Sequence, residues 1–454
     1  MSQTAINPAT GETVRTYEEH TADETRRRME LAGRAFTGWG RAPVAERAAV
    51  LRAAAAALKA STQDFAVLMA QEMGKPVAQG RGEIEKCAWV CEYYAEHGGT
   101  FLAPIPVATD AAKSFVAFEP LGAILAVMPW NFPFWQVFRA AAPALMAGNT
   151  IVLKHASNVP GCALAMDALF RDAGAPEGVF QALLVGSDQV AALIAHPAVR
   201  GVTLTGSTPA GKAVAAAAGA QLKKTVLELG GSDPYLILED ADLGAAAEAC
   251  AASRLINSGQ SCIAAKRFIA VEKVRRGFEE RLAARMRDQR MGDPLQEDTT
   301  VGPLARRDLR DALHQQVTGS VRQGARLLLG GQVPDGPGAF YPPTLLTDVR
   351  AGMPVYEEET FGPVAVVIAA ADEADAVRIA NGSRYGLGAA VFTRSRERGE
   401  RVAAALEAGC CFVNALVRSD PRLPFGGIKE SGYGRELSHF GLREFVNIKS
   451  VCIR

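Results

Sequence analysis

The first quarter of the chain has the pattern of amphipathic helices. Between residues 23 and 97 apolar side chains recur at helical spacing, and the segment VAERAAVLRAAAAALKA (44 to 60) is rich in helix-favouring residues. A short extended segment, KSFVAFEP (113 to 120), stands apart from the later pattern. The sequence therefore predicts a helical layer, followed by one strand in a hairpin or at a sheet edge that could pair with another subunit.

From residue 122 the pattern changes to short apolar strands that alternate with helices. The first series contains the strands GAILAVMP, TIVLKHA, VFQALLVG and RGVTLTG, with a helical stretch after each. After TVLELGG (225 to 231) a second series adds the strands KRFIAV, VAVVIA and AAVFT and helices at 243–256, 275–290, 304–323, 373–380 and 396–407. Such alternation is typical of parallel sheets covered by helices on both faces, so we predict two α/β domains.

Composition and charge narrow the class of protein. The 454 residues are 48% hydrophobic and 22% charged, as in a globular protein of two or three domains. Basic and acidic residues number 49 each, so no global field favours nucleic acid or an anionic membrane. The strongest apolar run, LGAILAVMPW (121 to 130), is too short for a membrane helix, and the N-terminal MSQTAINPATGETV lacks a signal-peptide pattern. We expect a cytoplasmic protein that binds small molecules and other copies of itself.

The cysteines and histidines form no regular framework. Eight cysteines at irregular positions favour reduced thiols, with disulfides as the minor alternative. The six histidines are scattered without a zinc-like pair, and Cys87 and Cys91 share a helix face without a second pair, which we interpret as packing. We therefore expect no metal ion.

The segment NSGQSCIAAKR (257 to 267) contains a candidate reactive cysteine. Gly259 and Gln260 suggest a turn that exposes the Cys262 thiol, and Lys266 and Arg267 could lower its pKa. A cysteine hydrolase would need a histidine partner in space, and no local signature supports one. From these residues alone, chemistry and packing both stay open for Cys262.

Three other segments carry candidate polar groups. Gly206 and Ser207, in LTGSTPAGK, lie between a strand and a helix, where N–H groups and the helix dipole can bind a phosphate, although such turns also occur without a ligand. Glu228, in LELGGSDP, suits a general base of raised pKa or a structural hydrogen bond. Asn131, in MPWNFPFWQ, suits a fixed amide donor or an ordinary turn.

Together and in this order, these segments resemble the aldehyde dehydrogenase superfamily over nearly the whole chain. The blocks that carry the resemblance are PWNFP (129 to 133), KHAS (154 to 157), TGST (205 to 208), ELGG (228 to 231), GQSC (259 to 262), EETFGPV (358 to 364) and PFGGIKESGYGRE (424 to 436). Within the superfamily, MPWNFPFWQVFR, LELGGSDP, GQSCIAAKRFI and GRELSHFGLREFVNIK are most similar to the bacterial succinate-semialdehyde dehydrogenases. The resemblance implies an α/β fold with a Rossmann-like cofactor domain (1–108 and 121–227), an α/β catalytic domain (228–440) and a small β oligomerisation element (109–120 and 441–454).

The resemblance also implies a reaction and its catalytic residues. Cys262 would attack an aldehyde as a thiolate, and the Asn131 side chain with the Cys262 N–H would hold the oxyanion. After hydride transfer to NAD(P)+, Glu228 would activate the water that hydrolyses the thioester. The expected cofactor contacts are Glu359 on the nicotinamide ribose, Lys154 on the adenine ribose or its phosphate, Gly206 and Ser207 on the pyrophosphate, and Trp130 and Leu229 along the cleft.

Cofactor preference is expected to depend on Ser157. Many NAD-preferring relatives carry a glutamate at this position, which would repel a 2′-phosphate. A hydroxyl beside Lys154 therefore predicts that NADP is preferred over NAD. The alternative is that Ser157 only caps the helix starting near Pro160 and that both cofactors work.

The substrate expected from the resemblance is succinate semialdehyde, with its carboxylate bound by Arg139 and Ser419. Certain relatives carry a second arginine where this chain has Ile256, so Arg418 is a candidate replacement, and Arg139 could instead form a structural ion pair. The alternatives are a dehydrogenase of other aliphatic or aromatic aldehydes and, last, an inactive relative with a binding or structural role. The alternating C-terminal VNIKSVCI would leave an apolar edge, so a homodimer or homotetramer is expected.

Overall fold

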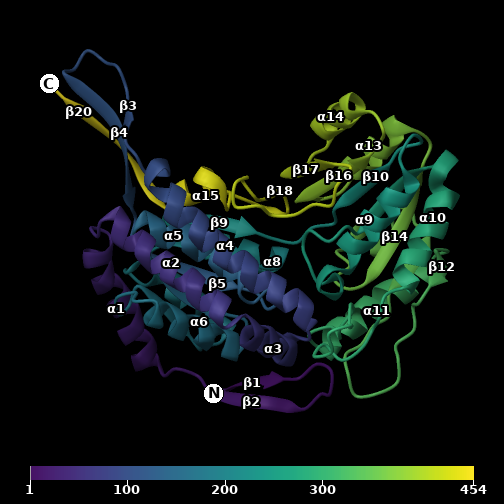
Figure 1. The fold of residues 1–454 in the computed structure, drawn as a ribbon, viewed down its shortest axis with the longest axis horizontal. Coiled ribbons are helices and arrows are strands. Elements are labelled where there is room, and N and C mark those ends of the chain that lie inside the picture. The colour runs from purple at the N-terminus through teal and green to yellow at the C-terminus, as the bar shows by residue number, and fades with distance from the viewer. Residues whose placement is uncertain (1) are drawn as a thin grey trace.

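The computed structural model describes residues 2–454, which form two α/β lobes and a projecting β arm (Figure 1). The first lobe is built on a six-stranded sheet in which all strands are parallel except β19. In spatial order its strands are β19 (Gly432–Tyr433), β9 (Lys224–Glu228), β8 (Val199–Thr205), β5 (Ala123–Met128), β6 (Thr150–His155) and β7 (Phe180–Leu183).

Helices cover both faces of this sheet, which explains why strands such as β6 are buried along their whole length. One face packs against α1 (Ala22–Trp39), α7 (Val190–Ala195) and α8 (Thr208–Gly219). The other packs against α2 (Val44–Ala60), α4 (Val77–Phe101), α5 (Trp135–Ala147) and α6 (Pro160–Asp172), with α3 (Thr62–Met73) alongside. The predicted N-terminal helical layer is therefore present and belongs to this lobe.

The second lobe is built on a seven-stranded sheet, again parallel except for one edge strand, β12. In spatial order its strands are β12 (Arg326–Leu329), β13 (Thr344–Thr347), β14 (Val364–Ala370), β11 (Arg267–Val271), β10 (Pro234–Ile237), β16 (Gly388–Phe392) and β17 (Cys410–Val413). Its helices are α9 (Leu243–Leu255), α10 (Glu272–Arg287), α11 (Arg307–Arg322), α12 (Pro354–Glu357), α13 (Glu373–Asn381) and α14 (Arg396–Ala405). Val366 and Val367 are neighbours in β14, and they pack into the hydrophobic cores on opposite faces of the sheet. This is the pattern expected of a strand that is buried on both faces.

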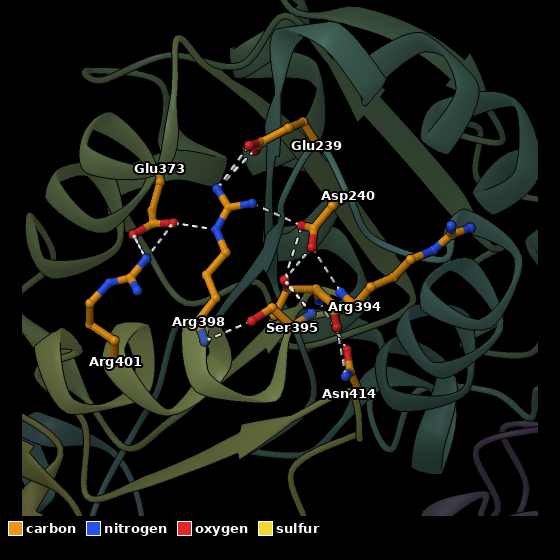
Figure 2. A network of polar contacts seen from close by, with 9 residues as sticks. Glu239, Asp240, Glu373, Arg394, Ser395, Arg398, Arg401 and Asn414 are labelled. Carbon is orange, nitrogen blue, oxygen red and sulfur yellow. Dashed lines mark hydrogen bonds and ion pairs between the residues drawn. The ribbon is translucent and has the colours of Figure 1, made fainter.

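A network of ion pairs centred on Arg398 fastens α14 to the second lobe (Figure 2). Its guanidinium lies 3.0 Å from Glu239 and 2.9 Å from Asp240, in the segment that follows β10, and it also contacts Glu373 of α13. Asp240 in turn accepts hydrogen bonds from the side chain of Thr393. One arginine thus joins three segments of the lobe.

The third sheet forms the arm seen at the C-terminus in Figure 1. Strand β20 (Val446–Ile453) pairs antiparallel with β4 (Lys113–Pro120), which also pairs with β3 (Ile105–Pro106). The strand predicted at 113–120 is therefore present, and of its two expected positions the hairpin is the one observed, with β3 as its partner. It is not an edge strand, because the C-terminal strand pairs with its other side. Ile448 and Ile453 of the outer strand remain exposed.

Two small features complete the fold and were not predicted. An antiparallel hairpin, β1 (Ser2–Ile6) and β2 (Thr13–Glu18), precedes α1, and a two-stranded ladder joins β15 (Tyr385–Gly386) to β18 (Ile428–Lys429). The short helix α15 (Ser438–Arg443) leads into the arm. None of the helices within residues 2–454 has the length and apolarity needed to cross a membrane.

Candidate active site

A cavity of about 540 Å³ reaches the thiol of Cys262 and is lined by residues from both lobes. Phe132 and Trp135 come from the first lobe, and Ile256 and Ile263 flank the cysteine in the second. Apolar side chains therefore form much of the wall. Charged and polar side chains, Lys86, Arg139, Arg418 and Ser419, also line this cavity.

A strained turn leads into Cys262. Asn257 (φ 52°, ψ 40°), Ser258 (φ 56°, ψ 31°) and Gly259 (φ 78°) adopt left-handed conformations in succession, which costs energy for the two residues that are not glycine. The turn is held from outside, because Gln79 accepts the Asn257 N–H at 2.6 Å and Ser258 Oγ accepts the N–H of Gly302 at 2.9 Å. The residues expected to form a turn do so, and the turn is more constrained than the sequence indicated.

Asn131 contacts the same loop. Its side-chain nitrogen donates to the carbonyl oxygen of Gln260 at 3.1 Å, and Asn257 Nδ2 donates both to that oxygen, at 3.1 Å, and to the Asn131 carbonyl, at 2.6 Å. Asn131 is only 4% exposed. The amide is thus fixed against the carbonyl group of Gln260, two residues before Cys262, and one of its two N–H groups remains available as a donor.

Lys266 ties Cys262 to Glu359. Its buried ammonium donates to the carbonyl oxygens of Cys262 (2.7 Å), Ser261 (3.0 Å) and Ala264 (3.3 Å), and lies 3.3 Å from Glu359 Oε1. The same carboxylate oxygen accepts the N–H of Gly231 at 3.0 Å. The cysteine loop, Glu359 and the glycine pair after Glu228 therefore form one connected unit.

The glycine pair is required by this close packing. A Cβ atom on Gly230 would lie 2.5 Å from Glu359 Oε2, and one on Gly231 would lie 2.7 Å from the Cys262 carbonyl oxygen. A side chain at Gly231 would clash with the backbone of the cysteine loop, and one at Gly230 would displace the Glu359 carboxylate. The ELGG block thus brings two distant segments of the chain together at its two glycines.

Glu228 ends β9 and is 1% exposed. Neither of its carboxylate oxygens has a hydrogen-bond partner within residues 2–454. Burial, reinforced by the negative charge of Glu436, raises the pKa of Glu228 well above its ordinary value, and Arg139 acts in the opposite direction. Of the two interpretations of this residue, the structure favours the unpartnered acid over a structural hydrogen bond.

The pKa of Cys262 differs from the sequence expectation. Burial raises it to about 12, and the charges of Arg139 and Lys266 lower it only in part. Lys266 does act in the predicted direction, but its ammonium is bound to carbonyl oxygens, and Arg267 points elsewhere, donating to Ser232, Ile379 and Ala380. The expected lowering is therefore confirmed for Lys266 and absent for Arg267, and burial outweighs it.

The predicted adenosine end of the cofactor site lies in a second cavity, of about 1060 Å³. Lys154, Ser157 and Trp130 all line it. Helix α6 begins without a side-chain cap and has Val159 at its N-cap, so Ser157 does not cap this helix. Two carboxylates, Glu19 and Asp188, line the same cavity, and their charges oppose the lowering of the Lys154 pKa by burial.

The remaining predicted cofactor residues lie at the junction of β8, β9 and α8. Ser207 caps α8, its hydroxyl accepting the Ala210 N–H at 3.4 Å, whereas the Gly206 N–H donates to the carbonyl of Glu228 at 2.9 Å. Gly206 therefore has no free N–H for a phosphate, and Ser207 is the better candidate. Leu229 is buried against the first turn of α8, where a Cβ on Gly211 would lie 2.5 Å from it.

Arg139 and Ser419 differ in their surroundings. Arg139 is 2% exposed, forms an ion pair with Glu436 and lies 4.6 Å from the centre of the Phe425 ring. Ser419 accepts a hydrogen bond from Lys86 Nζ at 2.8 Å. The structural ion pair proposed as an alternative for Arg139 is thus present, and the cavity contains a lysine that sequence reasoning missed.

The missed residues carried weak signals. Glu436 lies inside the PFGGIKESGYGRE block, and its position in a motif is the only sequence signal that it belongs to the site. The charge of Lys266 is evident from the sequence, but its bonds to three carbonyl oxygens are not. Lys86 lies in an ordinary amphipathic helix, and no local pattern shows that this helix borders the cavity.

The chain matches proteins of known family along its length. The sequence model of the Aldehyde dehydrogenase family matches residues 1–451. The "Probable succinate-semialdehyde dehydrogenase [NADP(+)]" of Synechocystis is 49% identical over 453 residues, with all of both chains covered. The "Succinate semialdehyde dehydrogenase [NAD(P)+] Sad" of Escherichia coli is 47% identical, covering 98% of this chain and 97% of its own.

Solved structures agree with the sequence match. The succinic semialdehyde dehydrogenase from Streptococcus pyogenes, in complex with NADP+, superposes with a TM-score of 0.97 at 38% identity, with 99% of each chain covered. The succinate-semialdehyde dehydrogenase from Burkholderia pseudomallei gives a TM-score of 0.97 at 38% identity, covering 100% of this chain and 94% of its own. With this fold, and with sequence similarity over its whole length, the chain belongs to the aldehyde dehydrogenase family.

Proposed function

We propose that this enzyme oxidises succinate semialdehyde to succinate with NADP+ as the preferred cofactor, and with NAD+ as a weaker alternative. The observation that carries the proposal is the cavity at Cys262, whose lining combines apolar side chains with the cationic groups of Lys86, Arg139 and Arg418 and the hydroxyl group of Ser419. A short aldehyde with a carboxylate at its far end matches both parts. The names of the similar proteins from Synechocystis and Escherichia coli support the same substrate.

The cofactor fits residues that are present. Lys154 and Ser157 share one cavity, and the Ser157 hydroxyl is not needed as a helix cap. A lysine and a hydroxyl can both bind a 2′-phosphate, while Glu359 and Ser207 would hold the nicotinamide ribose and the pyrophosphate. Bound NADP+ would supply the acceptor for the hydride. The NADP+ complex of the Streptococcus pyogenes enzyme supports this preference.

In the proposed mechanism Cys262 Sγ bonds to the aldehyde carbon, and the thiol proton passes to Glu228, whose pKa burial raises. The free N–H of Asn131 and the N–H of Cys262 hold the resulting oxyanion. Loss of hydride from the same carbon leaves a thioester on Cys262. The proton on Glu228 returns to solvent before hydrolysis. Glu228 then takes a proton from the attacking water, the carbon–sulfur bond breaks, the Cys262 thiolate regains a proton, and succinate leaves.

The division into domains and the assembly are also proposals. We infer that the six-stranded lobe binds the cofactor and the seven-stranded lobe carries the nucleophile. The boundaries are those predicted above, except that β19 joins the sheet of the first lobe. Exposed Ile448 and Ile453 on the outer strand of the arm support pairing of two chains into a homodimer or homotetramer. Eight free thiols are compatible with a reducing cytoplasm.

The test is a comparison of kcat/KM for succinate semialdehyde, glutarate semialdehyde, butanal and benzaldehyde with each cofactor. The proposal predicts the highest value for succinate semialdehyde with NADP+. A higher value for butanal or benzaldehyde would favour the second candidate, a dehydrogenase of uncharged aldehydes, which the apolar side chains of Phe132, Trp135 and Phe425 support.

A further inference from the structure

Lys86 has a fixed position in the cavity that contains Cys262. It extends from α4, and its ammonium donates to Ser419 Oγ at 2.8 Å and lies 4.3 Å from the centre of the Trp135 ring. Both contacts are neutral, so they orient the ammonium without neutralising it. The Ser419 hydroxyl, which accepts from Lys86, keeps its own hydrogen to donate.

Lys86 has no carboxylate within 4.0 Å in the part of the chain that the structure describes. Glu83, on the same helix, is paired with Lys75, and Asp420 is paired with Arg422 at 2.6 Å. An unpaired, half-buried cation is unfavourable unless an anion joins it. Burial and the nearby charge of Arg139 lower the pKa of Lys86 to about 8, while Cys87, Glu83 and Asp420 act in the opposite direction.

The other cations of this cavity are less suited to an anionic ligand. The charge of Arg139 is already matched by Glu436 in a buried ion pair. Ile256 lines the cavity and supplies no charge. Arg418 lines the cavity but its side chain is exposed, so solvent screens its charge.

We propose that Lys86, together with Ser419, binds the far carboxylate of the aldehyde and so sets the preference for carboxylated over uncharged substrates. This inference rests on the proposed function. It assigns Arg139 a different role: with Glu436 it sets the charge around Glu228, which every substrate needs. Lys86 therefore affects the choice of substrate, and Arg139 affects catalysis in general.

The test measures kcat/KM for succinate semialdehyde and for butanal, which has the same chain length without the carboxylate, in several variants. Lys86→Met should lower the ratio of the two values by roughly 10- to 100-fold, because a charge-assisted contact is lost for one substrate only. Lys86→Arg should keep most of the ratio, and Ser419→Ala should lower it by about 3- to 10-fold. Arg139→Met should lower both values together, with the ratio preserved. Lys59→Met, an exposed lysine on α2, serves as the matched control.

The outcomes separate this inference from the proposed function. If the wild-type enzyme does not prefer succinate semialdehyde to butanal, the proposed function is wrong. If it does, and Lys86→Met retains the preference, or if Arg139→Met abolishes it selectively, only the role of Lys86 is overturned. Should Lys86→Met fail to fold, Lys86→Gln and Ser419→Ala give the same readout, and an unchanged ratio in both would reject the inference.

Discussion

The ammonium nitrogen of Lys266 lies 2.7 Å from the carbonyl oxygen of Cys262, the candidate nucleophile. Because the same ammonium is 3.3 Å from Glu359, one buried side chain fixes both the cysteine loop and a carboxylate expected to hold the cofactor. The burial that makes these bonds strong also keeps the Cys262 pKa high. The structure therefore describes a resting thiol in a rigid setting, not a permanently ionised one.

Lys266→Met should disturb the cysteine loop and Glu359 together. We expect kcat to fall by roughly 10- to 100-fold, since small displacements of reacting groups have effects of this size, and KM for NADP+ to rise. Steady-state kinetics measure both. Lys273→Met, on the exposed face of α10, is the control. An unchanged kcat would show that the loop keeps its geometry without Lys266.

Ser157→Glu should reverse the cofactor preference. A carboxylate beside Lys154 would repel the 2′-phosphate of NADP+ and accept hydrogen bonds from the 2′-hydroxyl of NAD+, so the ratio of kcat/KM for NADP+ over NAD+ should fall by about tenfold or more. Titration of both cofactors with wild type and variant gives this ratio. A wild-type ratio at or below one would contradict the proposed preference, and an insensitive ratio would remove Ser157 from it.

The preference for succinate semialdehyde over butanal should depend on pH. The free-enzyme pKa of Lys86 is lowered to about 8, so the ammonium is present below this pH and lost above it. The ratio of the two kcat/KM values should therefore fall between about pH 7 and about pH 9, and taking a ratio cancels the ionisation of Cys262 and Glu228, which both substrates need. The groups that face Lys86 are Arg139 on α5, Glu83 and Cys87 on α4, and Asp420. A flat ratio in wild type, or the same fall in Lys86→Arg, would contradict this assignment.

Arg398→Ala should destabilise the second lobe. Three carboxylates converge on this guanidinium, whose side chain is 18% exposed (Figure 2), so we expect the free energy of unfolding to fall by roughly 1 to 2 kcal/mol. Arg401 contacts only Glu373 and is 65% exposed, and Arg401→Ala should cost less than about 0.5 kcal/mol. Thermal or denaturant unfolding of both variants makes the comparison. If both variants lost the same free energy of unfolding, the network around Arg398 would be no more stabilising than an ordinary surface ion pair.

The sequence predicted the parallel strands of the first sheet and three strands of the second, β11, β14 and β16, because these strands form apolar runs that are buried on both faces. It did not predict β10, β12, β13 and β17, which are only four residues long. The hairpin of β1 and β2 could not be predicted from apolar runs, because most of its residues are exposed and polar. The sequence also could not show that β19 crosses from the second lobe to pair with β9, because a two-residue strand has no periodicity.

In the candidate site, the residues within short motifs were predictable and the contacts between motifs were not. Cys262, Glu228 and Asn131 each stood out by an unusual local setting. The pairing of Arg139 with Glu436 and of Lys86 with Ser419 joins positions about 300 or more residues apart, and only the tertiary fold brings them together. The left-handed conformations of Asn257 and Ser258 were equally hidden, since neither residue type demands them.

The central claim is that Cys262 becomes acylated by succinate semialdehyde and that Glu228 is needed to release the product. The most direct measurement uses Glu228→Gln, mixed with succinate semialdehyde and NADP+, followed by peptide mass spectrometry. The account predicts that acylation, although slowed by the loss of the base that accepts the thiol proton, still yields one NADPH per active site. Turnover after this first NADPH should be slowed by roughly 10²- to 10⁴-fold, with a succinyl group on Cys262. Cys262→Ala should give neither this first NADPH nor the adduct. Wild-type turnover by Cys262→Ala, or an adduct on another cysteine, would contradict the account.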